Sequence, residues 1–406
     1  MRISAVATMG LVIALATPAS ADVITDWNQT ARVAMKAANT GNNPSTRNMA
    51  MMHVAMSDAV NAVENKFAIY TQGCPQMPAA SAEAAAAAAA RTVLLQQLPG
   101  QKALIDQAFE ASTKSIAEGA PRKDGIAVGE KCAAAVLADR EADGTNAPDA
   151  YRPITTPGVW IPTTPPLFAE YARAKPWVMK SADEVRPVPA PDLKSALYAR
   201  DYNETKDFGS AKSAKRTAEQ TETVKFWTQA NLGPVWQDAA RDLSAAKKLS
   251  LAENARLFAL LNMGIANTFI TDWDAKFTYN RWRPMTAIRN GDQDGNDATE
   301  RDAAWAPLNA NPMHPEYPSQ AAIIAGVSIG ILEGVFGANP TTPVVATDVN
   351  DAKLQRRYAN VQLLADEVQN VRVWGGIHFR TSLDVGYAMG KKIAVFMLEN
   401  SLKPAT

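Results

Sequence analysis

Histidine and cysteine are scarce in this chain of 406 residues, which limits the metal sites that it can build. It has three histidines, His53, His314 and His378, and two cysteines, Cys74 and Cys132. Because neither cysteine has a histidine close by in the sequence, a structural zinc site is not expected. The cysteines form either a disulfide or two buried thiols, and their separation along the chain leaves both alternatives open.

An excess of charge of one sign is also missing. Lysine and arginine together number 41, and so do aspartate and glutamate. The protein therefore has no broad positive field to attract nucleic acid, which we do not expect as a partner. Any affinity for an anion has to come from a few cationic side chains placed close together.

The chain lacks a second long apolar segment after its N-terminus. Residues 321–336 are the best later candidate, but they include Glu333 and fall short of the ~20 residues that span a bilayer. Residues 1–21 instead combine Arg2, an apolar run and a small-x-small site at Ala19–Ala21, as in a secretory signal peptide. We expect a periplasmic or secreted protein with no membrane span after removal of the signal.

Sustained strand alternation is absent too, and apolar residues recur at the three-to-four spacing of helices. The fold class predicted from this pattern is all-α, a multi-helix bundle. Residues 146–191 hold ten of the 25 prolines and so cannot be helical throughout. We expect an N-terminal helical part over 22–145, an ordered proline-rich strap over 146–191 and a helical core over 192–406.

Cationic side chains gather in Lys276–Pro284 (KFTYNRWRP). Lys276 and Arg283 are seven residues apart, which is two helical turns. Pro284 predicts that the helix ends or bends at Arg283, which would turn the guanidinium inward. The alternative interpretation is an ordinary basic face in contact with solvent.

A second segment offers hydrogen-bond donors that suit an anion. Pro318 predicts the start of a helix that reaches about Gly334. Ser319 and Gln320 would then lie in the first turn, where backbone N–H groups lack partners and the helix dipole is positive. The alternative is a core helix that simply begins with proline.

A third segment pairs an arginine with a histidine across two glycines. Arg372 and His378 flank Gly375 and Gly376, which permit a turn that brings the two side chains together. Just beyond them, Thr381–Asp384 resembles a capping box for a helix that reaches about residue 400. We therefore interpret Asp384 as a capping partner rather than as a catalytic acid.

Together, the three segments resemble the vanadium-dependent haloperoxidases and their relatives in the type 2 phosphatidic acid phosphatase (PAP2) superfamily. The pattern of that superfamily is lysine, six residues, Arg-Pro; then Pro-Ser-Gly-His; then arginine, five residues, histidine. Lys276–Pro284 and Arg372–His378 match in full, and Pro318–Ser319 matches in part. Residues 47–62, 160–166 and 216–227 also look like secreted bacterial members, so the resemblance extends over nearly the whole mature chain.

The resemblance implies an all-α bundle of the PAP2/haloperoxidase type that holds vanadate, with phosphate as a competing occupant. Lys276, Arg283 and Arg372 would neutralise the equatorial oxygens, while Ser319 and the N–H of Gln320 would hydrogen-bond them. His378 would be the axial vanadium ligand, or the phosphoryl-accepting nucleophile of a phosphatase. The candidate catalytic residues are thus Lys276, Arg283, Ser319, Arg372 and His378, and Gln320 joins them in binding the oxyanion.

The chain departs from the pattern at the acid–base histidine, which is replaced by Ala321. His53 and His314 are the remaining candidates for that role. The phosphatase pattern fails further, because Val371 stands for its serine and Ser382 for its aspartate. The resemblance therefore favours a haloperoxidase that oxidises halide with hydrogen peroxide. The alternatives are an acid phosphatase that cleaves phosphate esters through a phosphohistidine, and a non-catalytic oxyanion-binding protein.

Overall fold

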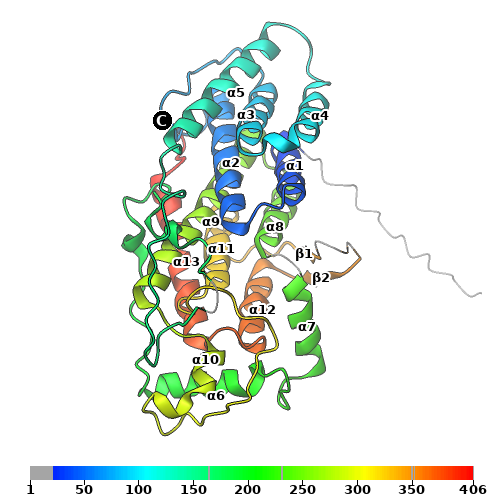
Figure 1. The fold of residues 1–406 in the computed structure, drawn as a ribbon. Helices are drawn as coiled ribbons and strands as arrows, with labels where there is room; N and C mark the ends of the chain where they lie inside the picture. Colours follow the sequence, from blue (N-terminus) through cyan, green and yellow to red (C-terminus); the bar gives the residue numbers. More distant parts are fainter. Residues whose placement is uncertain (1–21, 163–164, 230–231, 349–350, 352, 406) are drawn as a thin grey trace, which may run out of the picture.

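The computed structural model describes residues 22–162, 165–229, 232–348, 351 and 353–405. The signal peptide expected over residues 1–21 lies outside them. Within the described part, helices make up nearly all of the regular structure (Figure 1), so the predicted all-α fold class is confirmed. Every helix in that part is too short or too polar to cross a bilayer.

The N-terminal helices pack through unusually small residues. They are α1 (Val23–Ala37), α2 (Asn42–Glu64), α3 (Ala82–Gln97), the 3-10 turn η1 (Pro99–Gln101), α4 (Lys102–Thr113) and α5 (Ala120–Asp139). A Cβ atom added at Gly129 of α5 would lie 2.2 Å from the carbonyl oxygen of Ala85 in α3. The alanine-rich α3 therefore touches α5 backbone to backbone. Cys74 and Cys132 form a disulfide that joins the loop after α2 to α5, which decides between the two alternatives for these cysteines.

The C-terminal helices surround one long central helix. They are α6 (Ala196–Gly209), α7 (Ala218–Gln229), α8 (Leu232–Lys247), α9 (Leu251–Tyr279), α10 (Pro284–Arg289), η4 (Gly291–Gln293), α11 (Gln320–Phe336), α12 (Val361–Trp374) and α13 (Arg380–Asn400). A capping box of Ser250 and Glu253 begins α9, which is buried along most of its length and packs against α2, α11 and α13. A small antiparallel pair, β1 (Val344–Thr347) and β2 (Gln355–Tyr358), precedes α12.

Close packing of α11 against α13 places two helix N-termini side by side (Figure 1). A Cβ atom at Gly390 would lie 2.2 Å from the carbonyl oxygen of Ile323, and the backbone N–H of Ser319 donates to the carbonyl of Ser382 at 3.0 Å. The start of α11 is therefore fixed against the start of α13, next to the C-terminal end of α9.

The proline-rich residues 146–191 form no α-helix where they are described, and contain only the 3-10 turns η2 (Ala169–Arg173) and η3 (Ala182–Val185). They run along α9, to which several contacts tie them. The Trp177 N–H donates to Asn267 at 2.7 Å, and the Arg186 guanidinium pairs with Asp274 at 2.7 Å. We call residues 146–191 the strap.

Two helix starts differ from the sequence-based expectation. Ser319 has an extended backbone and is the N-cap of α11, so Pro318 precedes the helix instead of opening it. At α13, Phe379 is the N-cap and the expected capping box is absent. The carboxylate of Asp201 in α6 accepts from the N–H of Thr381 at 2.8 Å, so a distant side chain takes the place of Asp384.

Candidate functional site

The end of α9 separates the two cations of the KFTYNRWRP segment. Asn280 adopts a left-handed conformation with φ of 46° and ends the helix one turn after Lys276. Arg283 is then the N-cap of α10, with Pro284 at the first helical position. Lys276 and Arg283 therefore do not share the face of one straight helix. Both are turned inward, with exposed fractions of 0% and 1%.

Both cations bind the loop that precedes α11. The ammonium of Lys276 donates to the carbonyls of Pro315 and Glu316, each at 3.0 Å, and to that of Pro318. The guanidinium of Arg283 donates to the carbonyls of His314 at 3.0 Å and Pro315 at 3.3 Å. This loop carries Ser319 at its end, so the two cations position the start of α11.

Arg283 also reaches the loop between α12 and α13. Its Nη1 donates to the carbonyl of Ile377 at 2.8 Å and lies 3.2 Å from Nε2 of His378. Gly376 makes the turn before this histidine with φ of 76°, a conformation that favours glycine. Lys276, Arg283 and His378, which are separated by up to 102 residues in the sequence (378 − 276), thus form one buried group.

Glu316 is a site residue that the sequence analysis did not single out. Its Oε1 lies 2.8 Å from Nδ1 of His378 and accepts the N–H of Phe379 at 3.0 Å, while Oε2 accepts the hydroxyl of Ser382 at 2.7 Å. A neutral histidine that donates Nδ1–H to a carboxylate keeps a lone pair on Nε2. The one feature of the sequence that could have indicated Glu316 is that it is the sole acidic residue in the motif His314–Ser319.

Three polar groups of the predicted site have no partner. The Oγ of Ser319, the Nε2 of Gln320 and the Nε of Arg372 are buried without a hydrogen bond. In the described part of the chain, Arg372 forms no ion pair or side-chain hydrogen bond at all, although its charge lowers the pKa of Arg283 and His378. Buried donors rarely stay unpaired in native proteins, so these three groups fit a bound acceptor such as an oxyanion.

Burial and mutual repulsion shift the pKa values of the cations downward. Burial lowers the pKa of Lys276 to about 8, and the pKa of Arg283 and of Arg372 to about 10. Burial also raises the pKa of Asp272, which lies 3.7 Å from the Lys276 ammonium, to about 7, and it raises the pKa of Glu316. Lys276 and Arg283 thus face two carboxylates that resist ionisation, and Arg372 adds a third positive charge that acts on His378, which leaves positive charge for an anion to neutralise.

The structure separates the two histidines that were candidates for the missing acid–base group. His53 is fully buried in α2, stacks on Phe258 and contacts Asn28, far along the chain from the site segments. His314 is half-buried, and its Nδ1 lies 3.1 Å from Nη2 of Arg283. His314 and His378 therefore contact the same guanidinium, and burial followed by Arg283 lowers the pKa of both well below the usual value.

Known proteins share this architecture. Residues 256–404 match the family model for the VCPO second helical-bundle domain. A bacterial vanadium-dependent iodoperoxidase aligns with a TM-score of 0.77 and 20% identity over 94% of this chain and 97% of that chain. The apo form of a bacterial vanadium-dependent chloroperoxidase aligns with a TM-score of 0.69 and 17% identity over 87% of this chain and 92% of that chain. The holo form of a bacterial vanadium-dependent chloroperoxidase aligns with a TM-score of 0.69 and 16% identity over 94% of this chain and 93% of that chain.

The chain is a vanadium haloperoxidase-like protein in its fold. No curated protein sequence matches it at a significant level. The segment that matches the family model includes Lys276, Arg283, Ser319, Arg372 and His378. Within the described residues, no group of three or more histidine, cysteine, aspartate or glutamate side chains is placed to hold a bare metal ion. The unpaired donors of this site suit an oxyanion.

Proposed function

We propose that the protein is a vanadate-dependent haloperoxidase that oxidises halide with hydrogen peroxide at this site. The observation that carries the proposal is the unpartnered set of Ser319, Gln320 and Arg372 beside the buried cations. A haloperoxidase-like fold supports the same reaction class. When bound, vanadate supplies a Lewis acid that activates hydrogen peroxide toward attack by halide.

His378 would hold vanadate through Nε2. Its pKa lies well below the usual value, so the imidazole is neutral at physiological pH. Glu316 accepts from Nδ1 and thereby selects the tautomer whose Nε2 can act as a ligand. Arg283 donates toward the same Nε2, so its guanidinium would shift that hydrogen bond to an oxygen of the bound anion.

Lys276 would act mainly by binding backbone carbonyls of the protein rather than by binding the anion directly. Its three hydrogen bonds go to carbonyls of residues 315–318, so a direct contact with the anion requires that one of them be exchanged. The positive charge of Lys276 still lowers the pKa of His378, and Lys276 and Arg283 repel each other. Lys276 thus stabilises negative charge at the site and holds the loop that delivers Ser319 and Glu316.

His314 would take the acid–base role that the family assigns to the position of Ala321. Nδ1 of His314 lies 3.1 Å from Nη2 of Arg283 and 3.3 Å from the carbonyl oxygen of Pro315. Arg283 can only donate, so in the tautomer that accepts its shorter hydrogen bond the ring proton lies on Nε2. That Nε2–H has no hydrogen-bond partner in the described structure, and the side chain is half-exposed. We expect His314→Ala to lower turnover by roughly 10²-fold with little change in vanadate affinity, because general acid–base catalysis contributes on that scale.

The double variant His314→Ala/Ala321→His separates this role from a structural one. If position 321 is the family's acid–base position, the new histidine restores part of the lost turnover. Steady-state halide oxidation and calorimetric vanadate titration measure the two effects independently. Full activity of His314→Ala would refute the assignment.

The proposed reaction is tested by loading the purified protein with vanadate and following oxidation of iodide and bromide by hydrogen peroxide. We expect turnover that depends on vanadate and that phosphate inhibits by competition, because the two oxyanions share charge and shape. Arg372→Met, which removes a cation without another partner, should raise the vanadate concentration required. Tight vanadate binding without turnover would instead indicate a non-catalytic oxyanion-binding protein.

We further propose that the mature protein is exported. The Cys74–Cys132 disulfide fits an oxidising compartment, as does the signal-like sequence of residues 1–21. Cell fractionation with N-terminal sequencing measures the location and the cleavage site. Recovery of uncleaved protein in the cytoplasm would contradict export.

A further inference from the structure

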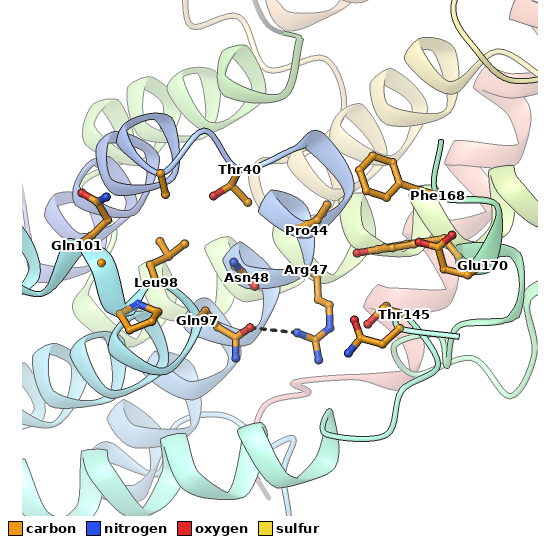
Figure 2. A pocket seen from close by; sticks show the side chains of 15 residues that line it. Thr40, Pro44, Arg47, Asn48, Gln97, Leu98, Gln101, Thr145, Phe168 and Glu170 are labelled. Carbon is orange, nitrogen blue, oxygen red and sulfur yellow. Dashed lines mark hydrogen bonds between the residues drawn. The ribbon is translucent and has the colours of Figure 1, made fainter. Parts of the chain in front are cut away.

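A cleft lies among the N-terminal helices, and its lining residues lie outside the oxyanion site. It is bounded by the start of α2, the end of α3 with η1, the loop after α5 and η2 of the strap (Figure 2). Its volume is about 540 Å³, which falls within the ~300–1,000 Å³ typical of small-molecule sites. None of the residues singled out in the sequence for oxyanion chemistry lines it.

Two nearly buried polar side chains open on this cleft without a hydrogen-bond partner. Asn48 is 5% exposed and Tyr171 is 4% exposed. Neither the amide of Asn48 nor the hydroxyl of Tyr171 forms a hydrogen bond with another described residue, and Figure 2 shows Asn48 in the wall of the cleft. An amide and a hydroxyl each both donate and accept, so together they suit a ligand that offers both kinds of group.

The charges of the cleft argue against an anionic ligand. Arg47 is the cation that lines it, and its guanidinium is already bound to Asp143 at 2.7 Å, to Gln97 at 3.3 Å and to the carbonyl of Arg140 at 2.6 Å. Glu170 has no cationic partner among the described residues. The cleft therefore offers a free carboxylate and neutral amides, which bind hydroxyl groups well and repel phosphate or carboxylate ligands.

An aromatic ring lies next to one of these polar groups in the lining of the cleft. Phe168 has a φ of 58°, a strained conformation for a bulky residue, and its ring lies where a Cβ atom added at Gly41 would be 3.0 Å away. The ring packs edge-on against Tyr171 at 5.8 Å between centroids. A ring beside amides and a carboxylate presents an apolar face next to hydrogen-bonding groups.

We propose that this cleft binds a neutral polyhydroxylated molecule of the size of a mono- or disaccharide. A sugar ring has hydroxyls that both donate and accept at its edge, and C–H groups on its faces that pack on an aromatic ring. Asn48, Tyr171 and Glu170 would bind the hydroxyls, and Phe168 would contact a face of the ring. This assignment does not depend on the reaction at the oxyanion site.

The test is a binding measurement on the full mature protein with named probes. Saturation-transfer NMR and calorimetry would be run with glucose, galactose, maltose and trehalose, and with choline and glucose 6-phosphate as cationic and anionic comparators. We expect at least one neutral sugar to bind with a millimolar or lower Kd and glucose 6-phosphate to bind more weakly than glucose. Binding of choline alone, or of none of the neutral sugars, would overturn the proposal.

Matched variants locate the binding in the cleft. Asn48→Leu and Tyr171→Phe each remove one hydrogen-bonding group with little change in shape, and should weaken sugar binding by roughly tenfold. Tyr387→Phe removes a hydroxyl bound to Gln362 elsewhere and should leave binding unchanged. If Asn48→Leu melts early, Gln101→Ala on the half-exposed rim replaces it. Sugar affinity that is unchanged in the cleft variants would place the binding elsewhere and refute the assignment.

Discussion

Replacing His378 by alanine is expected to abolish vanadate-dependent halide oxidation, with a loss of at least roughly 10³-fold in turnover, the scale of removing a group that acts directly on the reacting centre. The imidazole keeps a lone pair on Nε2, which lies 3.2 Å from Nη1 of Arg283, because Glu316 accepts from its Nδ1–H. Without Nε2, vanadate would be held by hydrogen bonds and charge alone. Vanadate titration by calorimetry and the iodide assay measure the two losses.

Two further variants make this result specific. Glu316→Gln keeps the size of the side chain but removes its charge, and we expect vanadate affinity to fall by about 10–100-fold, as for other partners of metal-bound histidines. His53→Gln removes a buried histidine outside the site and should retain turnover per folded molecule. Equal loss in all three variants, measured on protein with unchanged melting, would show that the histidine effect is not specific to the site.

The resemblance to the haloperoxidase pattern, rather than the spacing within any one segment, predicted that the three segments meet. Arg283 does contact both of the other segments. The positions of the helix ends were predicted less accurately. The helix that carries Lys276 ends at Tyr279, because Asn280 adopts the left-handed conformation. The helix therefore ends before it reaches Pro284, the residue that was expected to end or bend it. Pro318 was expected inside the helix, but the carbonyls around it are turned toward Lys276. A side chain distant in the sequence overrode the local signal.

Hydrogen bonds between side chains that are distant in the sequence could not be predicted from the sequence alone. Glu316 and His378 are 62 residues apart, and no local pattern marks an acid that will orient a histidine on another loop. The replacement of the family histidine by Ala321 was visible in the sequence. The placement of His314 beside Arg283 depends on hydrogen bonds from Arg283 to carbonyls of the loop before α11. The fold class, by contrast, follows from periodicity over hundreds of residues and tolerates errors at single positions.

The largest expected effect on stability comes from Lys276→Met. The ammonium is fully buried and binds three carbonyls and Asp272, so its loss leaves a buried carboxyl and several acceptors unpaired. We expect the free energy of unfolding to fall by about 3–5 kcal/mol, the usual cost of removing one member of a buried pair. Lys391→Met, at a partly exposed pair with Glu333, is the matched control and should change stability by less than about 1 kcal/mol.

The pH dependence of the Lys276 variant identifies the cause of the loss. Burial raises the pKa of Asp272 to about 7, and Lys276 is the main group that opposes this rise. In the Lys276→Met variant, the pKa of Asp272 should therefore be higher still. The folded variant then holds a proton that the unfolded chain releases at its ordinary, lower pKa, so its stability decreases as the pH rises through that interval. Adding Asp272→Asn removes the titrating group and should restore much of the stability and flatten the pH profile. Denaturant unfolding at acidic and neutral pH measures both, and a double variant as unstable as Lys276→Met alone would assign the loss to the three carbonyls instead.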